Sequence, residues 1–254
     1  MSHPVIIVTG ASRGIGAAVV ETLLTSKEAP RVVGVSRTEA GLKAIEEKYP
    51  GRFVYVTGDV ADEATSDAVV RKAIDTFGHI HGIVFNAGVL EPVAQVANAD
   101  ISKWRQLYEI NLFAPLTLAS KAIPYLRTTF GRLIFVSSGA SKSNYSGWAA
   151  YGSSKAALNH LAASIAAEEN SLFTVAIAPG VVDTRMQDDI RSKFANGMSS
   201  QQLERFTNLK KNGELLHPGV PGEILANLAL RGQGDDLNGK YLRYNDAALD
   251  GYKN

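Results

Sequence analysis

A serine, a tyrosine and a lysine are spaced in this sequence as acid–base chemistry on a carbonyl group requires. Ser138 follows an apolar run, and Tyr151 and Lys155 stand four residues apart at the start of an alanine-rich helical pattern. Residues four apart share one face of a helix, and a nearby ammonium group favours the charged form of a phenol. We therefore expect Lys155 to lower the pKa of Tyr151 from about 10, so that Tyr151 donates a proton near neutral pH.

A glycine-rich loop near the start of the sequence predicts a dinucleotide-binding site. Gly10, Gly14 and Gly16 lie between a short apolar run and an amphipathic helical pattern. Gly10 permits a tight turn, while Gly14 and Gly16 let the backbone approach a pyrophosphate at the helix N-terminus. Together with the tyrosine and the lysine, this loop indicates hydride transfer to a small-molecule carbonyl substrate.

The end of the second apolar run, at 31–35, suggests which nicotinamide nucleotide is used. No acidic residue stands there, although an NAD-binding unit places one at this point for the ribose hydroxyl groups. Arg37 is available instead, and Arg13 lies in the glycine loop. Because guanidinium groups pair well with phosphate, we predict a preference for NADP(H). The alternative is that both arginines are solvated surface residues.

Polar residues at other strand ends are further candidates. Asp59 could bind the adenine amino group or cap a helix, Asn86 could hydrogen-bond across strands, and Thr184 could reach the nicotinamide carboxamide. The full set of predicted cofactor contacts is Gly10, Ser12, Arg13, Gly14, Ile15, Gly16, Arg37, Asp59, Val60, Asn86, Ala87, Gly88, Tyr151, Lys155, Pro179, Gly180, Val182 and Thr184.

Asn111 lies in the middle of a long helical pattern at 101–127. Asparagine is a poor residue for a helix interior because its side chain competes for backbone hydrogen bonds. Asn111 is therefore either a surface residue or a residue that holds a water feeding protons to Lys155.

The elements that must position these residues alternate regularly along the chain. Apolar strand-like runs separated by helical patterns lie at 5–9, 31–35, 53–56, 80–85, 132–137, 172–178 and 240–243. This alternation, without a break in composition, predicts a single doubly wound α/β domain over 1–254 with helices on both faces of a parallel sheet. The polar stretch at about 185–213 lacks a strand pattern and is expected to cap the substrate site.

Composition excludes several classes of function. The 254 residues carry a formal net charge of +1 and contain no cysteine. The charge balance gives no case for a nucleic-acid or membrane partner, and thiolate chemistry, disulfides and zinc–thiolate sites are excluded. We expect no metal site. No run approaches the about 20 apolar residues that span a bilayer, so we expect a cytoplasmic protein.

These motifs occur together and in order, and the chain resembles the short-chain dehydrogenase/reductase family over essentially its whole length. The resemblance implies a seven-stranded Rossmann-type sheet in the order 3-2-1-4-5-6-7. It also implies Tyr151 as the acid/base, with Lys155 binding the ribose and tuning Tyr151. Ser138 would orient the substrate carbonyl, and Asn111 would complete a proton relay. Ser137 is the alternative to Ser138, but the separation of Ser138 from Tyr151 matches the usual gap in the family.

Three other runs are similar to fungal benzil reductases, which are related to sepiapterin reductases. These runs lie at 135–141, 178–184 and 237–246. The similarity implies reduction of one carbonyl of an aromatic 1,2-diketone to the S alcohol (benzil to (S)-benzoin). A sepiapterin-type or general ketone reductase remains an alternative, and a non-catalytic NADP-binding sensor is the alternative from a different class.

Two further expectations concern surfaces. Apolar faces on the helices around 104–126 and 156–165 either cover the sheet or also pair with a second copy, and family analogy favours a homodimer or homotetramer. Tyr145, Trp148 and Met186 are candidates for the substrate wall, or they are packing residues.

Overall fold

Seven parallel strands form the central layer of the computed structural model, which describes residues 3–253. Their order in the sheet is 3-2-1-4-5-6-7, as the family resemblance implied. The strands are β1 (Val5–Thr9), β2 (Arg31–Ser36), β3 (Phe53–Thr57), β4 (Gly82–Phe85), β5 (Arg132–Val136), β6 (Phe173–Ala178) and β7 (Tyr241–Arg243).

The apolar composition of the central strands follows from burial on both faces of the sheet. Successive side chains of a strand point to opposite faces. In β1, Ile6 and Val8 belong to one core layer, whereas Val5 and Ile7 belong to the other, and all four are fully buried. A strand in the middle of this sheet, such as β1, therefore requires a continuous run of apolar residues.

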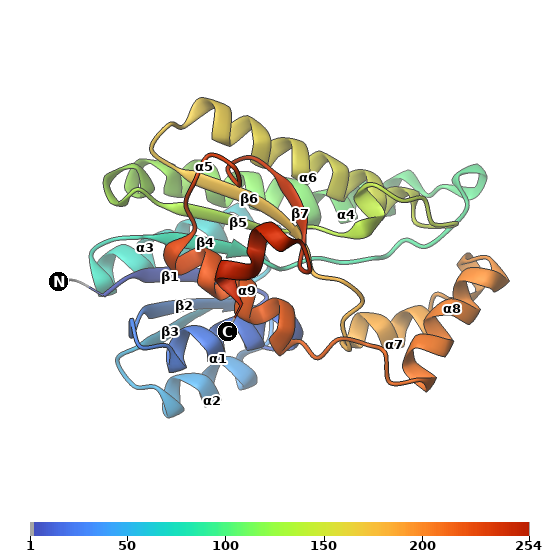
Figure 1. The fold of residues 1–254 in the computed structure, drawn as a ribbon, viewed down its shortest axis with the longest axis horizontal. Coiled ribbons are helices and arrows are strands. Elements are labelled where there is room, and N and C mark those ends of the chain that lie inside the picture. Colours follow the sequence, from blue (N-terminus) through green and yellow to red (C-terminus); the bar gives the residue numbers. More distant parts are fainter. Residues whose placement is uncertain (1–2, 254) are drawn as a thin grey trace.

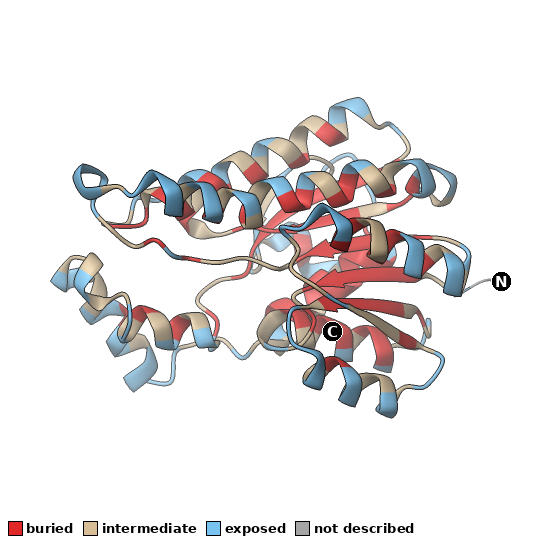
Figure 2. Ribbon diagram, turned by 180° about the vertical axis from the view of Figure 1, so that it is seen from behind, coloured by how far each residue is buried: buried red, intermediate tan, exposed pale blue. Residues whose placement is uncertain are grey.

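Helices cover both faces of the sheet, which confirms the doubly wound α/β architecture (Figure 1). One face is covered by α1 (Gly14–Thr25), α2 (Glu39–Lys48) and α9 (Gly219–Arg231), and the other by α3 (Glu63–Phe77), α5 (Ala114–Leu126) and α6 (Ala149–Glu168). Figure 2 shows the consequence: buried residues lie on the sheet and on the helix sides that face it, and exposed residues lie on the outer sides.

The helical region predicted at 101–127 is interrupted. It consists of α4 (Ile101–Tyr108), one π-helical turn over Glu109–Phe113, and then α5. The π turn widens the helix at Asn111, the residue that fits an ordinary helix interior poorly. The predicted helical region is therefore confirmed, with a π turn at Asn111 that the sequence pattern did not indicate.

The polar stretch after β6 folds into two helices that stand apart from the layers around the sheet (Figure 1). They are α7 (Arg185–Arg191) and α8 (Ser200–Lys211), and both lie within the segment expected to lack strands. Among residues 3–253, no helix combines the length and the apolar character needed to cross a bilayer.

Candidate active site

The three residues expected to perform acid–base chemistry meet at the carboxyl end of β5. Ser138 leaves the strand in an extended conformation, and its hydroxyl lies beside the phenol of Tyr151. One helical turn beyond Tyr151, Lys155 donates through Nζ to the carbonyl of Val136, at 2.8 Å. Tyr151 and Lys155 are both buried, with exposed fractions of 7% and 4%. The arrangement is a small, largely dehydrated acid–base centre.

The two adjacent serines have different partners. The hydroxyl of Ser137, which is 2% exposed, donates to Oδ1 of Asn159 at 2.5 Å. The oxygen of Ser138 accepts from the backbone N–H of Ala140 at 3.1 Å, while its hydroxyl contacts Tyr151. In this structure Ser138, and not Ser137, is therefore the serine beside the phenol.

The expected direction of the pKa shift at Tyr151 is wrong. Burial raises the pKa of Tyr151 above its ordinary value, and the hydrogen bond with Ser138 only opposes that rise. Burial also lowers the pKa of Lys155 to about 8, because removal of water disfavours the charged form of either group. The ammonium nitrogen lies 5.9 Å from the centre of the Tyr151 ring and binds a backbone carbonyl. Tyr151 thus keeps its proton throughout the neutral range.

Asn111 is fully buried, so it is not the surface residue that its isolated position allowed. Its amide exchanges two hydrogen bonds with the backbone of Val89, both 2.9 Å long, and donates to the hydroxyl of Ser154 at 3.2 Å. A Cβ atom at Gly88 would lie 3.3 Å from Oδ1 of Asn111 and 3.4 Å from Nζ of Lys155. The glycine therefore lets the amide and the ammonium group approach from opposite sides.

The glycine loop packs tightly against the end of β4. Gly10 has a φ of +68°, and a Cβ atom at Gly16 would lie 2.1 Å from the carbonyl oxygen of Gly10. The side chain of Asn86 donates to the carbonyls of Thr9 and Gly10, at 3.0 and 3.3 Å. The predicted role of Asn86 in hydrogen bonding between strands agrees with this geometry, which shapes the loop at the N-terminus of α1.

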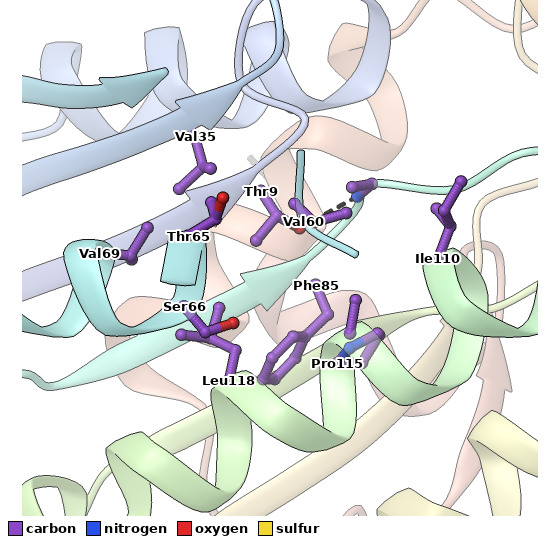
Figure 3. Close-up of a pocket in the computed structure, with 12 residues that line it drawn as sticks. Thr9, Val35, Val60, Thr65, Ser66, Val69, Phe85, Ile110, Pro115 and Leu118 are labelled. Atoms are coloured by element: carbon purple, nitrogen blue, oxygen red, sulfur yellow. Dashed lines mark hydrogen bonds between the residues drawn. The ribbon is translucent and has the colours of Figure 1, made fainter. Parts of the chain in front are cut away.

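A cavity beside the loop brings together residues near the carboxyl ends of β1, β2 and β4 and Val60, which follows β3 (Figure 3). Val60 and Ala87, both predicted cofactor contacts, line it with Thr9, Val35 and Ile110. The wall of this cavity is mostly apolar.

The residues expected to read the adenosine end lie close to one another. Arg37 Nη1 is 3.9 Å from a carboxylate oxygen of Asp59, and Asp59 also accepts from the backbone N–H of Ala61. The hydroxyls of Ser12 and Ser36 are 2.8 Å apart. Asp59 thus serves as a local turn acceptor, while hydroxyl and guanidinium groups gather where an acid would otherwise bind the ribose.

The segment after β6 reaches back to the glycine loop. A Cβ atom at Gly14 would lie 3.3 Å from the methyl group of Thr184, so these two predicted contacts are neighbours. Gly180 has a φ of +84° and packs beneath the ring of Tyr244, and Val182 is buried and bridges to Leu216. The turn that carries Thr184 is therefore held by contacts with the glycine loop and with Tyr244 and Leu216.

An aromatic stack stands on the other side of Tyr151. Trp148 meets the Tyr151 ring edge-on at 5.9 Å, and the Trp148 ring stacks with Tyr145 at 4.9 Å and with Phe206 at 5.5 Å. Met186 packs against the same cluster. Tyr145, Trp148 and Met186 were expected at the substrate wall; the structure places Trp148 against Tyr151, and it places Tyr145 and Met186 in the same cluster.

Sequence reasoning missed Phe206 and Asn159. Phe206 is 2% exposed and comes from α8, and apolar spacing within the polar stretch at 203, 206 and 209 would have indicated a buried side of that helix. Asn159 lies four residues after Lys155, so the helical repeat that joins Tyr151 to Lys155 would have included it.

Comparisons with known proteins agree with this geometry. Residues 4–195 match the family model described as short chain dehydrogenase. The chain is 47% identical over 255 residues to a benzil reductase ((S)-benzoin forming) of Saccharomyces cerevisiae, with 96% of this chain and 97% of the relative covered.

Two solved structures from Saccharomyces cerevisiae are also similar. A short chain dehydrogenase/reductase has a TM-score of 0.97 and 46% identity, covering 99% of this chain and 100% of its own. A cytoplasmic protein with unknown function has a TM-score of 0.85 and 45% identity, with the same coverage.

Proposed function

This chain belongs to the short-chain dehydrogenase family, and from that premise we propose that it is an NADPH-dependent carbonyl reductase in which Tyr151 donates the proton. The observation that carries the proposal is the contact between the Ser138 hydroxyl and the Tyr151 phenol, with Lys155 one turn further along the same buried helix face. As an oxidoreductase of this family, the protein has a small-molecule substrate.

The residues around the glycine loop fit a nicotinamide nucleotide. The loop has no side chains at Gly10, Gly14 and Gly16, and it opens onto the N-terminus of α1, where free N–H groups favour phosphate. Val60 and Ala87, which line the apolar cavity beside the loop, would contact the adenine ring. When bound, the reduced nucleotide supplies a hydride. Arg13 and Arg37 support the choice of NADP over NAD, since no acid stands at the end of β2.

The protein groups then handle the substrate oxygen. We assign Ser138 to hydrogen-bond the substrate carbonyl and Tyr151 to donate the proton to that oxygen, so that the two groups stabilise the negative charge as it develops. The phenol is protonated before transfer, because burial keeps its pKa above the ordinary value of about 10. We assign Lys155 and Asn111 to the path that returns a proton to Tyr151, since a Cβ atom at Gly88 would lie 3.3 Å from Oδ1 of Asn111 and 3.4 Å from Nζ of Lys155.

We propose an aromatic ketone or 1,2-diketone as the substrate, with a benzil-type diketone giving an S hydroxy ketone. Two observations support this choice: the stack of Tyr145, Trp148 and Phe206 beside Tyr151, and the 47% identity to a benzil reductase over nearly the whole of both chains. Flat rings pack well against such a wall. Helices α7 and α8, which contribute Met186 and Phe206, would cap the bound substrate.

The test is oxidation of NADPH, followed by absorbance, with a panel of ketones that includes benzil, acetophenone and sepiapterin. We expect benzil to be among the best substrates and chiral chromatography to show the S alcohol. Tyr151→Phe should reduce kcat by about 10²- to 10⁴-fold while NADPH binding persists. Tyr49→Phe, at the C-terminal end of α2, removes a surface hydrogen bond to Glu21 and is the matched control.

Full turnover by Tyr151→Phe would refute the assignment of the proton donor. A preference for sepiapterin or simple ketones would favour the two alternative reductases, and NADPH binding without any turnover would favour a sensor.

We also propose a cytoplasmic homodimer or homotetramer. Phe113, Leu116 and Tyr125 lie next to or within α5 and are 41–44% exposed, which suits contact with a second copy. The similarity to a Saccharomyces protein described as cytoplasmic supports the location. Light scattering coupled to gel filtration measures the oligomeric state.

A further inference from the structure

A chain of hydrogen bonds links the helix of Tyr151 and Lys155 to the turn that carries Ser138. We propose that Asn159 is a positioning residue that acts through Ser141 to hold Ser138 against Tyr151. The inference rests on the proposed carbonyl reduction for its kinetic consequences. It assigns a role to two polar side chains, Asn159 and Ser141, that the mechanism above does not use.

The links are short and come from three different elements. Asn159 follows Lys155 by one turn of α6, so Tyr151, Lys155 and Asn159 face the end of β5 together. Oδ1 of Asn159 accepts from the hydroxyl of Ser137 at 2.5 Å. Nδ2 of Asn159 donates to the oxygen of Ser141 at 2.9 Å.

The direction of each hydrogen bond is fixed by the last acceptor in the chain. The Ser141 hydroxyl lies 2.7 Å from the backbone carbonyl of Ser138, and a carbonyl can only accept. The single proton of Ser141 is thus committed, so Ser141 must accept from its other neighbour, and only the NH₂ side of Asn159 can donate there. The carbonyl side of the amide must then face Ser137. Asparagine satisfies both requirements at once, whereas aspartate lacks the donor.

The last acceptor in this chain of hydrogen bonds is the backbone carbonyl of Ser138, the residue whose hydroxyl must be placed accurately against Tyr151. The carbonyl of Ser138 receives the Ser141 hydroxyl, the Ser141 N–H at 3.1 Å and the Tyr241 hydroxyl at 3.3 Å. Its side-chain oxygen receives the N–H of Ala140. With its backbone carbonyl held and its side-chain oxygen accepting from Ala140, the hydroxyl of Ser138 has its proton left for Tyr151 or for a substrate oxygen.

Loss of this support should affect turnover more than binding. A displacement of about 1 Å in a reacting group can reduce the rate by about 100-fold. Asn159 and Ser141 do not line the glycine loop or the cavity beside it, so NADPH binding should not change. The expected signature is a lower kcat with an unchanged KM for NADPH.

The experiment compares three variants with the wild-type protein. Asn159→Asp keeps the shape and the acceptor for Ser137 but removes the donor to Ser141, and Ser141→Ala removes the hydroxyl without adding charge. We expect each to lower kcat for benzil by about 10- to 100-fold, with KM for NADPH within about twofold of wild type. Ser141→Thr retains a hydroxyl and should restore most of the activity.

A double-mutant cycle shows whether Asn159 acts through Ser138. In a Ser138→Ala background, Asn159→Asp should have little further effect, because the group that it positions is already missing. The proposal would be overturned if the fold-decreases in kcat of the two single variants multiplied fully in the double variant. Wild-type kcat in both Asn159→Asp and Ser141→Ala would overturn it as well.

A readout without activity separates this inference from the proposed function. Crystal structures of wild type and Asn159→Asp should show the Ser138 hydroxyl moved away from Tyr151 in the variant, and an unmoved hydroxyl would refute the positioning role. If the wild-type protein reduced none of the ketones, the proposed reductase activity would be refuted. The positioning role of Asn159 would then be tested by the displacement of Ser138 alone.

Discussion

Lys155 carries a buried charge that should destabilise the folded protein at neutral pH. Its pKa falls from 10.5 to about 8 on burial, and its side chain is 4% exposed. Between these two values the unfolded chain binds more protons than the folded one, so this contribution makes the protein more stable as pH rises from 8 towards 10.5. Below pH 8 the full penalty is present.

The perturbation that exposes this penalty is Lys155→Met, which keeps the length of the side chain and removes the charge. From the two pKa values, the penalty in wild type is about 3 kcal/mol at pH 7 and about 2 kcal/mol at pH 9, so that about 1.3 kcal/mol is relieved over this range. The hydrogen bond to the carbonyl of Val136 can form in either protonation state, and its loss, about 1 kcal/mol, is a constant offset.

The assay is urea unfolding of the nucleotide-free protein at pH 7, 8 and 9. The free energy of unfolding of Lys155→Met, relative to wild type, should decrease by about 1.3 kcal/mol from pH 7 to pH 9. Lys72→Met, at an exposed position on α3, controls for the loss of one positive charge. Its free energy of unfolding relative to wild type should hardly change between pH 7 and pH 9. The same Lys155→Met protein should lose turnover. A difference in unfolding free energy that stays constant with pH would refute the buried-charge reasoning.

Two further predictions concern the nucleotide site. Arg37→Ala should lower kcat/KM with NADPH by about tenfold or more but leave kcat/KM with NADH almost unchanged, because only NADPH carries a 2′-phosphate on its adenosine ribose for a charge-assisted hydrogen bond of about 1.5–3 kcal/mol; equal losses with both nucleotides would contradict this. Gly16→Ala should destabilise the protein by about 1–3 kcal/mol and lower Tm by about 2–10 °C, since its Cβ would lie 2.1 Å from the carbonyl oxygen of Gly10 and 2.6 Å from Nδ2 of Asn86. Gly251→Ala, which meets nothing within 4 Å, is the control in thermal unfolding, and an equal Tm for the two variants would show that the loop tolerates a side chain.

Local patterns in the sequence were enough to predict the sheet, the glycine loop and the shared face of Tyr151 and Lys155. Each is encoded over a few neighbouring residues: apolar runs define strands, and a spacing of four places two side chains on one side of a helix. The absence of an acid after β2 is equally local. The strand order came from the family resemblance.

Other features depend on contacts between distant segments, and only the tertiary structure decided them. The sign of the pKa shift at Tyr151 is set by burial beneath Trp148 and its neighbours, so the spacing to Lys155 alone gave the wrong direction. Asn111 became a buried residue because a π turn aims its amide at the backbone of Val89. Phe206 contacts Trp148, although the two residues are 58 positions apart in the sequence. Dehydration and the choice of hydrogen-bond partner are properties of the packed chain, and no window of neighbouring residues contains them.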